Sequence, residues 1–251
     1  MTLPADGHVH SQWSWDAPGG DLIRTCARAV ELGLPALAFT EHVDLTPWTL
    51  PEGRVQLAPP FDVAGYLAAI AECRERFPTL RVLSGVEFSE PHWHAARLRA
   101  LPGLDRVLGS VHSRQTAADR FLEIRDAYAE VPAAEVVRGY LAEVERMVAG
   151  STDFEVVTHV DYPLRYWPAA AGRCDIAAHE PAFRAALAAI ARSGRILELN
   201  TRATVHTELL GWWHAAGGRA VSFGSDAHHP EALARQFRAA ATAARAHGFR
   251  P

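Results

Sequence analysis

The 251-residue chain contains no lysine, and all 25 of its Lys and Arg residues are arginine. The absence excludes a Schiff-base lysine, a lysine-based phosphate loop and a carboxylated-lysine metal bridge. Recognition of phosphate must therefore come from arginine, metal ions or backbone amides. The net charge of −4 shows no basic excess, so we expect no nucleic-acid partner.

Cysteine is scarce, and long apolar runs are missing. Cys26, Cys73 and Cys174 are far apart and show no CxxC spacing, which is typical of reduced thiols in a cytoplasmic protein. The first residues lack the basic and apolar regions of a signal peptide. No apolar run approaches the ~18 residues that span a bilayer. We therefore expect a cytoplasmic protein with no membrane partner, and the sequence does not indicate its oligomeric state.

The chain does have a regular alternation of short apolar runs and amphipathic helical patterns. The predicted strands are Asp6–His10, Ala36–Thr40, Arg81–Glu87, Arg106–His112, Glu155–His159, Arg195–Asn200 and Ala220–Asp226. The predicted helices are Leu22–Leu32, Val63–Phe77, Ala134–Ala149, Glu180–Ser193 and Ala232–Ala246. Leu45–Asp62 and Asp161–Asp175 are irregular and are expected to be long loops. Apolar strands separated by helices indicate an α/β fold with a parallel sheet. No linker divides the chain, so we expect one barrel-like domain over residues 1–251.

Potential metal ligands stand at the ends of nearly all these strands. They are His8, His10, His42, Glu87, His112, His159, Asp226 and His228, with Asp16 shortly after the first pair. In a closed parallel barrel, all carboxyl ends of strands meet at one face. Side chains at i and i+2 of a strand point the same way, so both histidines of "HVH" can face the mouth; those of "SDAH" can if the last strand continues. Imidazole and carboxylate together favour zinc, manganese or iron.

Other polar residues are expected to lie outside this site. "PHWH" (His92 and His94) is a second HxH, but it starts a predicted helix, where i and i+2 diverge, so we expect it at the surface. Glu41 faces opposite to His42 on its strand and is a weaker candidate. The remaining histidines expected to face solvent are His179, His206, His214, His229 and His247.

The ordered motifs "HVH…D", "TEH", "GVE", "GSVH", "THVD" and "SDAH" resemble the polymerase-and-histidinol-phosphatase (PHP) superfamily. The chain length, the "GSVHS" block and Asp16 look most like its histidinol-phosphate phosphatase branch. The resemblance implies a distorted (β/α)7 barrel that holds three divalent metal ions (Zn, Mn or Fe). It implies a first site of His8, His10, Glu87 and Asp226, a second of Glu87, His112 and His159, and a third of Asp16, His42 and His228.

The resemblance also implies hydrolysis of a small phosphomonoester, with histidinol phosphate as the expected substrate. A hydroxide that bridges two ions would attack phosphorus in line. Arg165 and, as second choice, Arg114 are candidate clamps for the phosphate, and Asp161 or a metal-bound water is the candidate proton donor to the leaving alkoxide. A cationic substrate needs an acidic pocket, and Asp44 and Glu90, like Asp161, lie near strand ends.

Three alternatives stay open at this point. The same centre could serve a PHP phosphatase or phosphodiesterase that acts on another small phosphoester. An amidohydrolase also begins with HxH on a barrel strand, but it usually relies on a carboxylated lysine or a glutamate bridge and a single late aspartate; the missing lysine and the paired "SDAH" disfavour it. The chain could also be a non-catalytic module that retains metal and binds a partner. An incomplete set of ligands would favour this alternative, whereas the set in this sequence looks complete.

Overall fold

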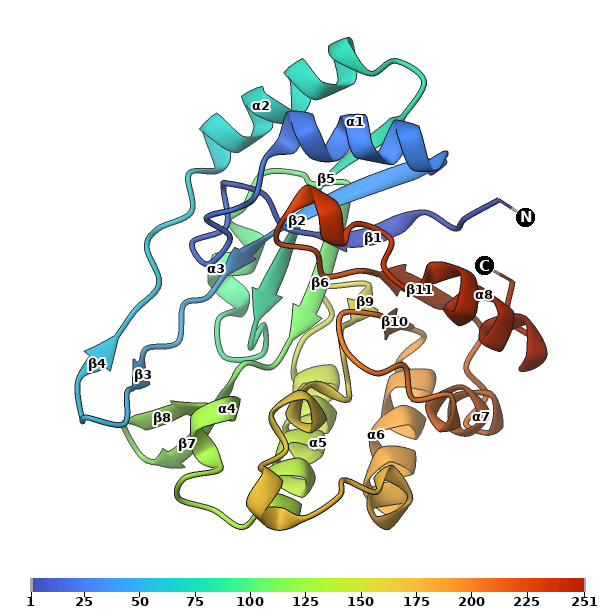
Figure 1. Cartoon of the computed structure of the whole chain (residues 1–251). Coiled ribbons are helices and arrows are strands. Elements are labelled where there is room, and N and C mark those ends of the chain that lie inside the picture. The colour runs from blue at the N-terminus through green and yellow to red at the C-terminus, as the bar shows by residue number, and fades with distance from the viewer. Residues whose placement is uncertain (1, 251) are drawn as a thin grey trace.

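One parallel sheet forms the centre of the structure, a computed structural model that describes residues 2–250 (Figure 1). The end positions of the expected 1–251 domain lie outside the described residues. The sheet has 7 strands in the order β1-β2-β5-β6-β9-β10-β11, and every neighbouring pair is parallel. Their bounds are β1 Asp6–Val9, β2 Ala36–Val43, β5 Arg81–Ser89, β6 Arg106–Ser110, β9 Val156–Val157, β10 Ile196–Asn200 and β11 Val221–Gly224.

The chain after β11 returns to β1 and nearly closes the sheet into a barrel. Val9 and Ala227 form a parallel bridge, and the His10 N–H donates to the Ala227 carbonyl at 2.8 Å. The Asp226 N–H donates to the His8 carbonyl, also at 2.8 Å. The predicted (β/α)7 architecture is therefore confirmed, and its closure places the ends of the first and last strands side by side.

Helices surround this barrel and bury its outer face. They are α1 Leu22–Leu32, α2 Val63–Arg76, α3 Ala95–Arg99, α4 Ile124–Ala127, α5 Ala133–Gly150, α6 Glu180–Ser193, α7 Glu208–Ala215 and α8 Phe237–Ala246. Figure 1 shows α1 and α2 on one side and α5, α6 and α7 on the opposite side. Asp62 caps α2 by accepting from the Gly65 N–H at 3.0 Å, as an aspartate before a helix favours. Within residues 2–250, none of the helices has the length and apolar character that crossing a membrane requires.

The last helix begins later than the sequence predicts. The expected span Ala232–Ala246 is observed only as Phe237–Ala246. A short 3₁₀ helix, Pro230–Ala232, precedes it, and the backbone at Ala234 and Gln236 is left-handed, with φ of 54° and 59°. Left-handed residues cannot continue a right-handed helix, so the helical pattern in the sequence extends beyond the helix that forms.

Two hairpins stand beside the mouth of the barrel, and neither was predicted. Strands β3 (Trp48–Thr49) and β4 (Val55–Gln56) form inside the stretch expected to be a loop. Strands β7 (Ser113–Ala117) and β8 (Arg120–Glu123) follow β6, and β8 contacts β3. The two stretches that were expected to be long loops therefore differ in structure. The first contains the β3–β4 hairpin, and the second, after β9, contains the 3₁₀ helices Tyr162–Tyr166 and Ala169–Ala171.

Candidate metal centre

The structure brings all nine predicted ligands to one face of the barrel. The parallel register places His42 on β2 beside Glu87 on β5. His112 and His159 each follow a strand by two residues, after β6 and β9. Asp226 has a left-handed backbone with φ of 52°, so β11 has already ended at Gly224 and the i, i+2 strand argument does not apply there. Aspartate tolerates this conformation, and the turn directs its carboxylate toward the centre.

The first group of donors lies at the junction of β1 and β11. The Nε2 atoms of His8 and His10 are 3.0 Å apart, and Glu87 Oε2 lies 3.1 Å from the former. Asp226 Oδ1 is 3.5 Å from His10 Nε2. These side chains are almost fully buried. A tetrahedral zinc ion with bonds of ~2.0–2.1 Å spaces its donors by about 3.3 Å, so this group fits an ion.

The second group shares Glu87 with the first. Its Oε1 lies 2.7 Å from His159 Nε2 and 3.2 Å from His112 Nε2, whereas its Oε2 faces His8. The two oxygens of one carboxylate therefore point to two sets of imidazoles. This arrangement matches the bridging position that the family resemblance implies for Glu87.

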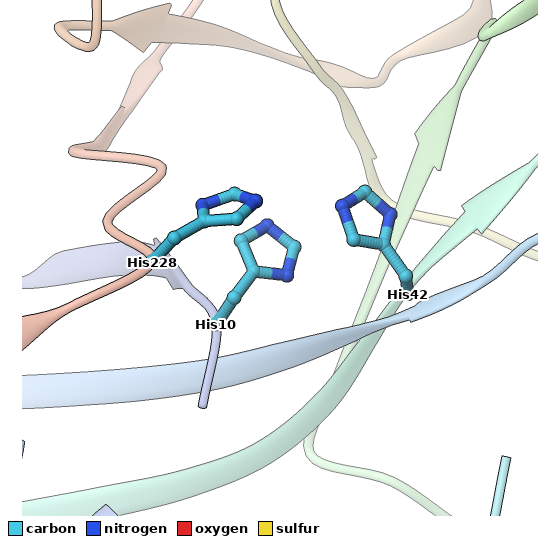
Figure 2. A group of neighbouring side chains, drawn as sticks. All are labelled: His10, His42 and His228. Atoms are coloured by element: carbon cyan, nitrogen blue, oxygen red, sulfur yellow. The ribbon is translucent and has the colours of Figure 1, made fainter. Parts of the chain in front are cut away.

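The third group lies where β1, β2 and the segment after β11 meet. Figure 2 shows the rings of His10, His42 and His228 converging from these three elements. Asp16 Oδ2 is 3.0 Å from His228 Nε2 and 3.5 Å from His42 Nε2. Among the described residues, the buried Asp16 Oδ1 has no hydrogen-bond partner, and neither has His42 Nδ1, which faces Glu87 Oε2 at 3.4 Å. Buried polar atoms are rarely left unsatisfied, so these two orphans also fit bound ions.

The electrostatics of the centre follow from burial and close pairing. Burial alone would raise the pKa of Glu87, but the imidazoles around it, His8 foremost, hold that pKa well below its usual value. Burial alone would lower the pKa of His42, but carboxylates led by Asp16 outweigh it and raise the pKa to about 9. A metal ion must displace the protons on these imidazoles, so the metal affinity of the centre rises with pH.

Several histidines do not lie where the sequence predicts. The side chain of His92 is buried against α5, where its Nε2 is 2.7 Å from Glu143 Oε1, and His94 Nε2 is 2.9 Å from Thr46 Oγ1. His179 is buried as well. The expectation that His92 and His179 face solvent was wrong, because other segments cover their side chains, whereas His94 is partly buried. His214 and His229 are exposed, while His206 and His247 are partly buried.

Glu41 is buried away from the ligands, as its position opposite His42 on β2 predicts. Its Oε1 accepts from the Ser11 hydroxyl at 2.6 Å, and its Oε2 accepts from the Ser14 hydroxyl, also at 2.6 Å. Ser14 Oγ in turn lies 3.0 Å from His10 Nδ1. Glu41 thus touches the metal centre only through a serine.

A cavity of about 210 Å³ opens onto the ligands, and the candidate catalytic residues differ in their relation to it. Arg165 lines the cavity and donates from Nη1 to Asp226 Oδ2 at 2.8 Å, and its buried Nη2 has no hydrogen-bond partner within residues 2–250. Arg114 instead lines a separate cavity between β7 and α5. Asp161 is buried and is not among the residues that line the metal-site cavity.

Three residues near the ligands were not singled out from the sequence. Arg202 lines the cavity and donates from Nη1 to Asp226 Oδ1 at 2.9 Å. Glu198 and Asn200, on β10, contact the ligands from behind. The available signal was the strand "ILELN" itself, in which a glutamate and an asparagine interrupt an apolar run at alternate positions.

Comparison with known proteins places the chain in a family. The PHP domain family matches residues 6–202. The chain belongs to the PHP domain family. The match ends before Asp226 and His228, which the structure nevertheless places with the other ligands. The family predicted from the ordered motifs is therefore confirmed.

Named relatives extend this comparison. A Thermotoga maritima protein named "Probable histidinol-phosphatase" is 24% identical over 238 residues, covering 92% of this chain and 86% of that protein. A Deinococcus radiodurans protein of the same name is 28% identical over 253 residues, covering 94% and 91%. The crystal structure of a Lactococcus lactis histidinol phosphate phosphatase, complexed with zinc, L-histidinol and phosphate, has a TM-score of 0.85 at 22% identity, covering 99% of this chain and 94% of that one. This likeness shows that the folds are the same.

Proposed function

We propose that this PHP-family chain is a metal-dependent phosphatase that hydrolyses a small phosphomonoester, with histidinol phosphate as its substrate. The observation that carries the proposal is Glu87, whose two oxygens face two separate sets of imidazoles beneath a cavity lined by arginine. The names of the relatives from Thermotoga maritima and Deinococcus radiodurans support the substrate.

The three groups of donors would hold divalent ions, with zinc, manganese or iron suited to the mixture of imidazole and carboxylate. Such ions, when bound, lower the pKa of water and neutralise phosphoryl oxygens. Glu87 would bridge the first two positions, and Asp16 with His42 and His228 would hold the third.

Two arginines that line the cavity would bind the phosphoryl group. Asp226 holds Arg165 through Nη1, which leaves the buried Nη2 free to donate to a phosphoryl oxygen. The guanidinium also lies over the Tyr162 ring, with its carbon 5.2 Å from the ring centroid. Arg202 approaches Asp226 from the other side. Because arginine forms bidentate contacts with phosphate, this pair orients the ester for attack. Arg114 lies at another cavity, so we assign it no part in binding.

The leaving group must receive a proton, and Asp161 was the candidate donor. Burial raises the pKa of its carboxyl, which suits a proton donor, but the side chain does not line the cavity. The carboxyl does interact with Arg165: burial lowers the pKa of that guanidinium, but Asp226 and then Asp161 outweigh burial and raise the pKa. We therefore propose that Asp161 supports Arg165 and that water in the cavity supplies the proton.

The remaining walls of the cavity are aromatic and charged. Trp15, Trp48 and Tyr166 line it with Asp44 and Glu123. Arg125 also lines it and pairs with Glu123 at 2.7 Å, so Asp44 is the wall carboxylate without an arginine partner among the lining residues. Carboxylates and aromatic faces attract cations, and aromatic faces also stack on flat rings. A leaving group that carries an amine and an imidazole matches these walls better than a neutral sugar, which supports histidinol phosphate as the substrate.

A phosphatase panel with metal-reconstituted protein tests the proposal. We expect kcat/KM for histidinol phosphate to exceed that for p-nitrophenyl phosphate and for sugar phosphates by about 100-fold, since only the first fills the acidic, aromatic walls. Metal-stripped protein is the control. Hydrolysis of other monoesters but not of histidinol phosphate would refute the proposed substrate. Preferred cleavage of bis(p-nitrophenyl) phosphate would indicate a phosphodiesterase. Less than one bound metal ion per chain after reconstitution would refute the metal centre.

A further inference from the structure

Strand β10 is the one strand of the barrel that supplies none of the nine donors, yet it carries a buried carboxylate directly behind them. Glu198 Oε1 lies 2.6 Å from His8 Nδ1. Its Oε2 accepts from the His159 backbone N–H at 2.8 Å and from Asn200 Nδ2 at 3.1 Å. Only 1% of the Glu198 side chain is exposed, so water does not compete for these bonds.

These bonds determine which nitrogen of His8 faces the centre. When Nδ1–H donates to Glu198, the lone pair of Nε2 is free, and Nε2 is the atom that lies 3.1 Å from Glu87 Oε2. A carboxylate behind a metal-binding histidine fixes the ring and makes it a stronger ligand. The other oxygen of Glu198 holds the backbone of His159, whose Nε2 faces Glu87 Oε1 at 2.7 Å.

The barrel provides space for this side chain at Gly224 on β11. A Cβ atom at that position would overlap Glu198 Oε1 and would come within 2.7 Å of His8 Cβ. Glu198 lies on β10 and Gly224 on the paired strand β11, where Gly224 is in register with Asn200. The glycine therefore leaves the space in which the Glu198 carboxylate reaches His8.

We propose that Glu198 is a positioning residue that fixes the first and second metal positions relative to each other, because one carboxylate holds His8 with one oxygen and His159 with the other. Glu87 links the same two positions from the side of the cavity, and Glu198 links them from behind. The inference rests on the metal centre of the proposed function but is independent of the substrate.

The substitution Glu198→Gln tests whether the two oxygens of Glu198 hold His8 and His159 in place. Both oxygens of Glu198 act as acceptors, whereas a glutamine offers one acceptor oxygen and one donor NH₂, so either His8 or His159 faces a donor. The matched control is Glu143→Gln, because Glu143 is also a buried carboxylate that binds a histidine, His92, at 2.7 Å but lies away from the centre. Metal affinity is measured by competition with a chromogenic chelator, and the cobalt-loaded proteins are compared by their visible absorption spectra.

We expect Glu198→Gln to weaken metal affinity by about 10- to 100-fold and to change the cobalt spectrum, while Glu143→Gln leaves both unchanged. Wild-type affinity together with a wild-type spectrum in Glu198→Gln would overturn the proposal, whatever happens to turnover. An equal loss in both variants would overturn it too, since it would reflect general destabilisation. If the wild-type protein itself retains no metal, the proposed function fails and this inference fails with it.

A measurement on the wild-type protein keeps the proposal testable if Glu198→Gln does not fold. In zinc-loaded protein labelled with ¹⁵N-histidine, we expect His8 to show a protonated Nδ1 that is hydrogen-bonded and an Nε2 shifted by the metal. A His8 ring with Nδ1 bound to zinc would contradict the proposal. Neither result depends on the substrate, so failure here leaves the phosphatase assignment standing.

Discussion

Two HxH motifs in this chain have the same spacing and different structures. His8 and His10 lie at the end of β1, both are fully buried, and their Nε2 atoms approach to 3.0 Å. His92 and His94 lie in the turn before α3. His92 reaches Glu143 on α5, and His94 reaches Thr46 after β2.

The difference shows that the backbone decides what a pair of histidines can do. A strand points side chains i and i+2 to the same face, so His8 and His10 share one group of donors. A turn sends them in different directions, so His92 and His94 each find a separate polar partner. The first pair faces the other candidate metal ligands, and the second joins segments distant in sequence.

The largest effect is expected when the first pair is broken. His10→Ala or Glu87→Ala removes a donor from the shared centre, and we expect kcat to fall by at least about 10³-fold with loss of bound metal. Turnover and metal content of each variant, measured after reconstitution, check this. Near-normal turnover in either variant would refute a centre in which Glu87 bridges two positions.

Metal binding is expected to stabilise the protein in a pH-dependent way. An ion at 100 times its dissociation constant stabilises the fold by about 2.7 kcal/mol. In the metal-free protein, carboxylates overcome burial and raise the pKa of His42 from 6.5 to about 9. The stability that this pairing contributes is complete below pH 6.5 and is lost as the pH rises through about 9.

The gain in thermal stability on adding zinc or manganese should therefore be larger at pH 9 than at pH 6, because protons compete less and the metal-free fold is weaker. Thermal unfolding with and without metal at both pH values measures this gain. His10→Ala is the comparison and should show a smaller gain than the wild-type protein at both pH values, because it lacks one donor of the first group. A gain in the wild-type protein that does not change with pH would contradict the assignment.

Substitution in the second HxH motif, His92 and His94, should change the free energy of unfolding without changing metal affinity or kcat. His92→Ala removes the partner of a buried carboxylate, so we expect the free energy of unfolding to fall by roughly 1–3 kcal/mol. Glu143 keeps its ion pair with Arg146, which limits the loss. Urea unfolding gives the stability change, and metal affinity and kcat should stay at wild-type values. A fall in metal affinity would mean that the two HxH motifs are coupled.

The smallest effect is expected at His94. A glutamine there can retain a hydrogen bond to Thr46, so His94→Gln should change the free energy of unfolding by about 0.5 kcal/mol or less. The same urea experiment measures it, with His92→Ala as the comparison. A change as large as that of His92→Ala would show that His94 contributes more than its bond to Thr46.

Much of the barrel could be predicted from local patterns. The observed bounds of α1 (Leu22–Leu32) and α6 (Glu180–Ser193) are those predicted, because both helices have strong periodicity and each ends next to a glycine. The hairpins β3–β4 and β7–β8 could not be found in this way. Their strands are short and partly exposed, so alternation is too weak to distinguish them from loops.

The residues that were missed share a physical reason. Glu198 belongs to a buried strand, and its role depends on facing His8, which is 190 positions away in the sequence. Arg202 follows the same strand and belongs to no recognisable motif. It is of interest only because its Nη1 lies 2.9 Å from Asp226 Oδ1 in the folded chain. Arg114 and Arg165 both follow the end of a predicted strand, so the sequence does not distinguish them, but in the structure they line different cavities.

The sequence by itself determined which donors stand at the ends of the strands, because strand periodicity and parallel order place those ends on one face. Only the tertiary structure decided which donors meet. The closure of β11 onto β1 brings Asp226 beside His10, and this distance depends on how the strands and helices pack rather than on any local pattern. Local chemistry supplied the ligands of the centre, and long-range packing set the distances between them.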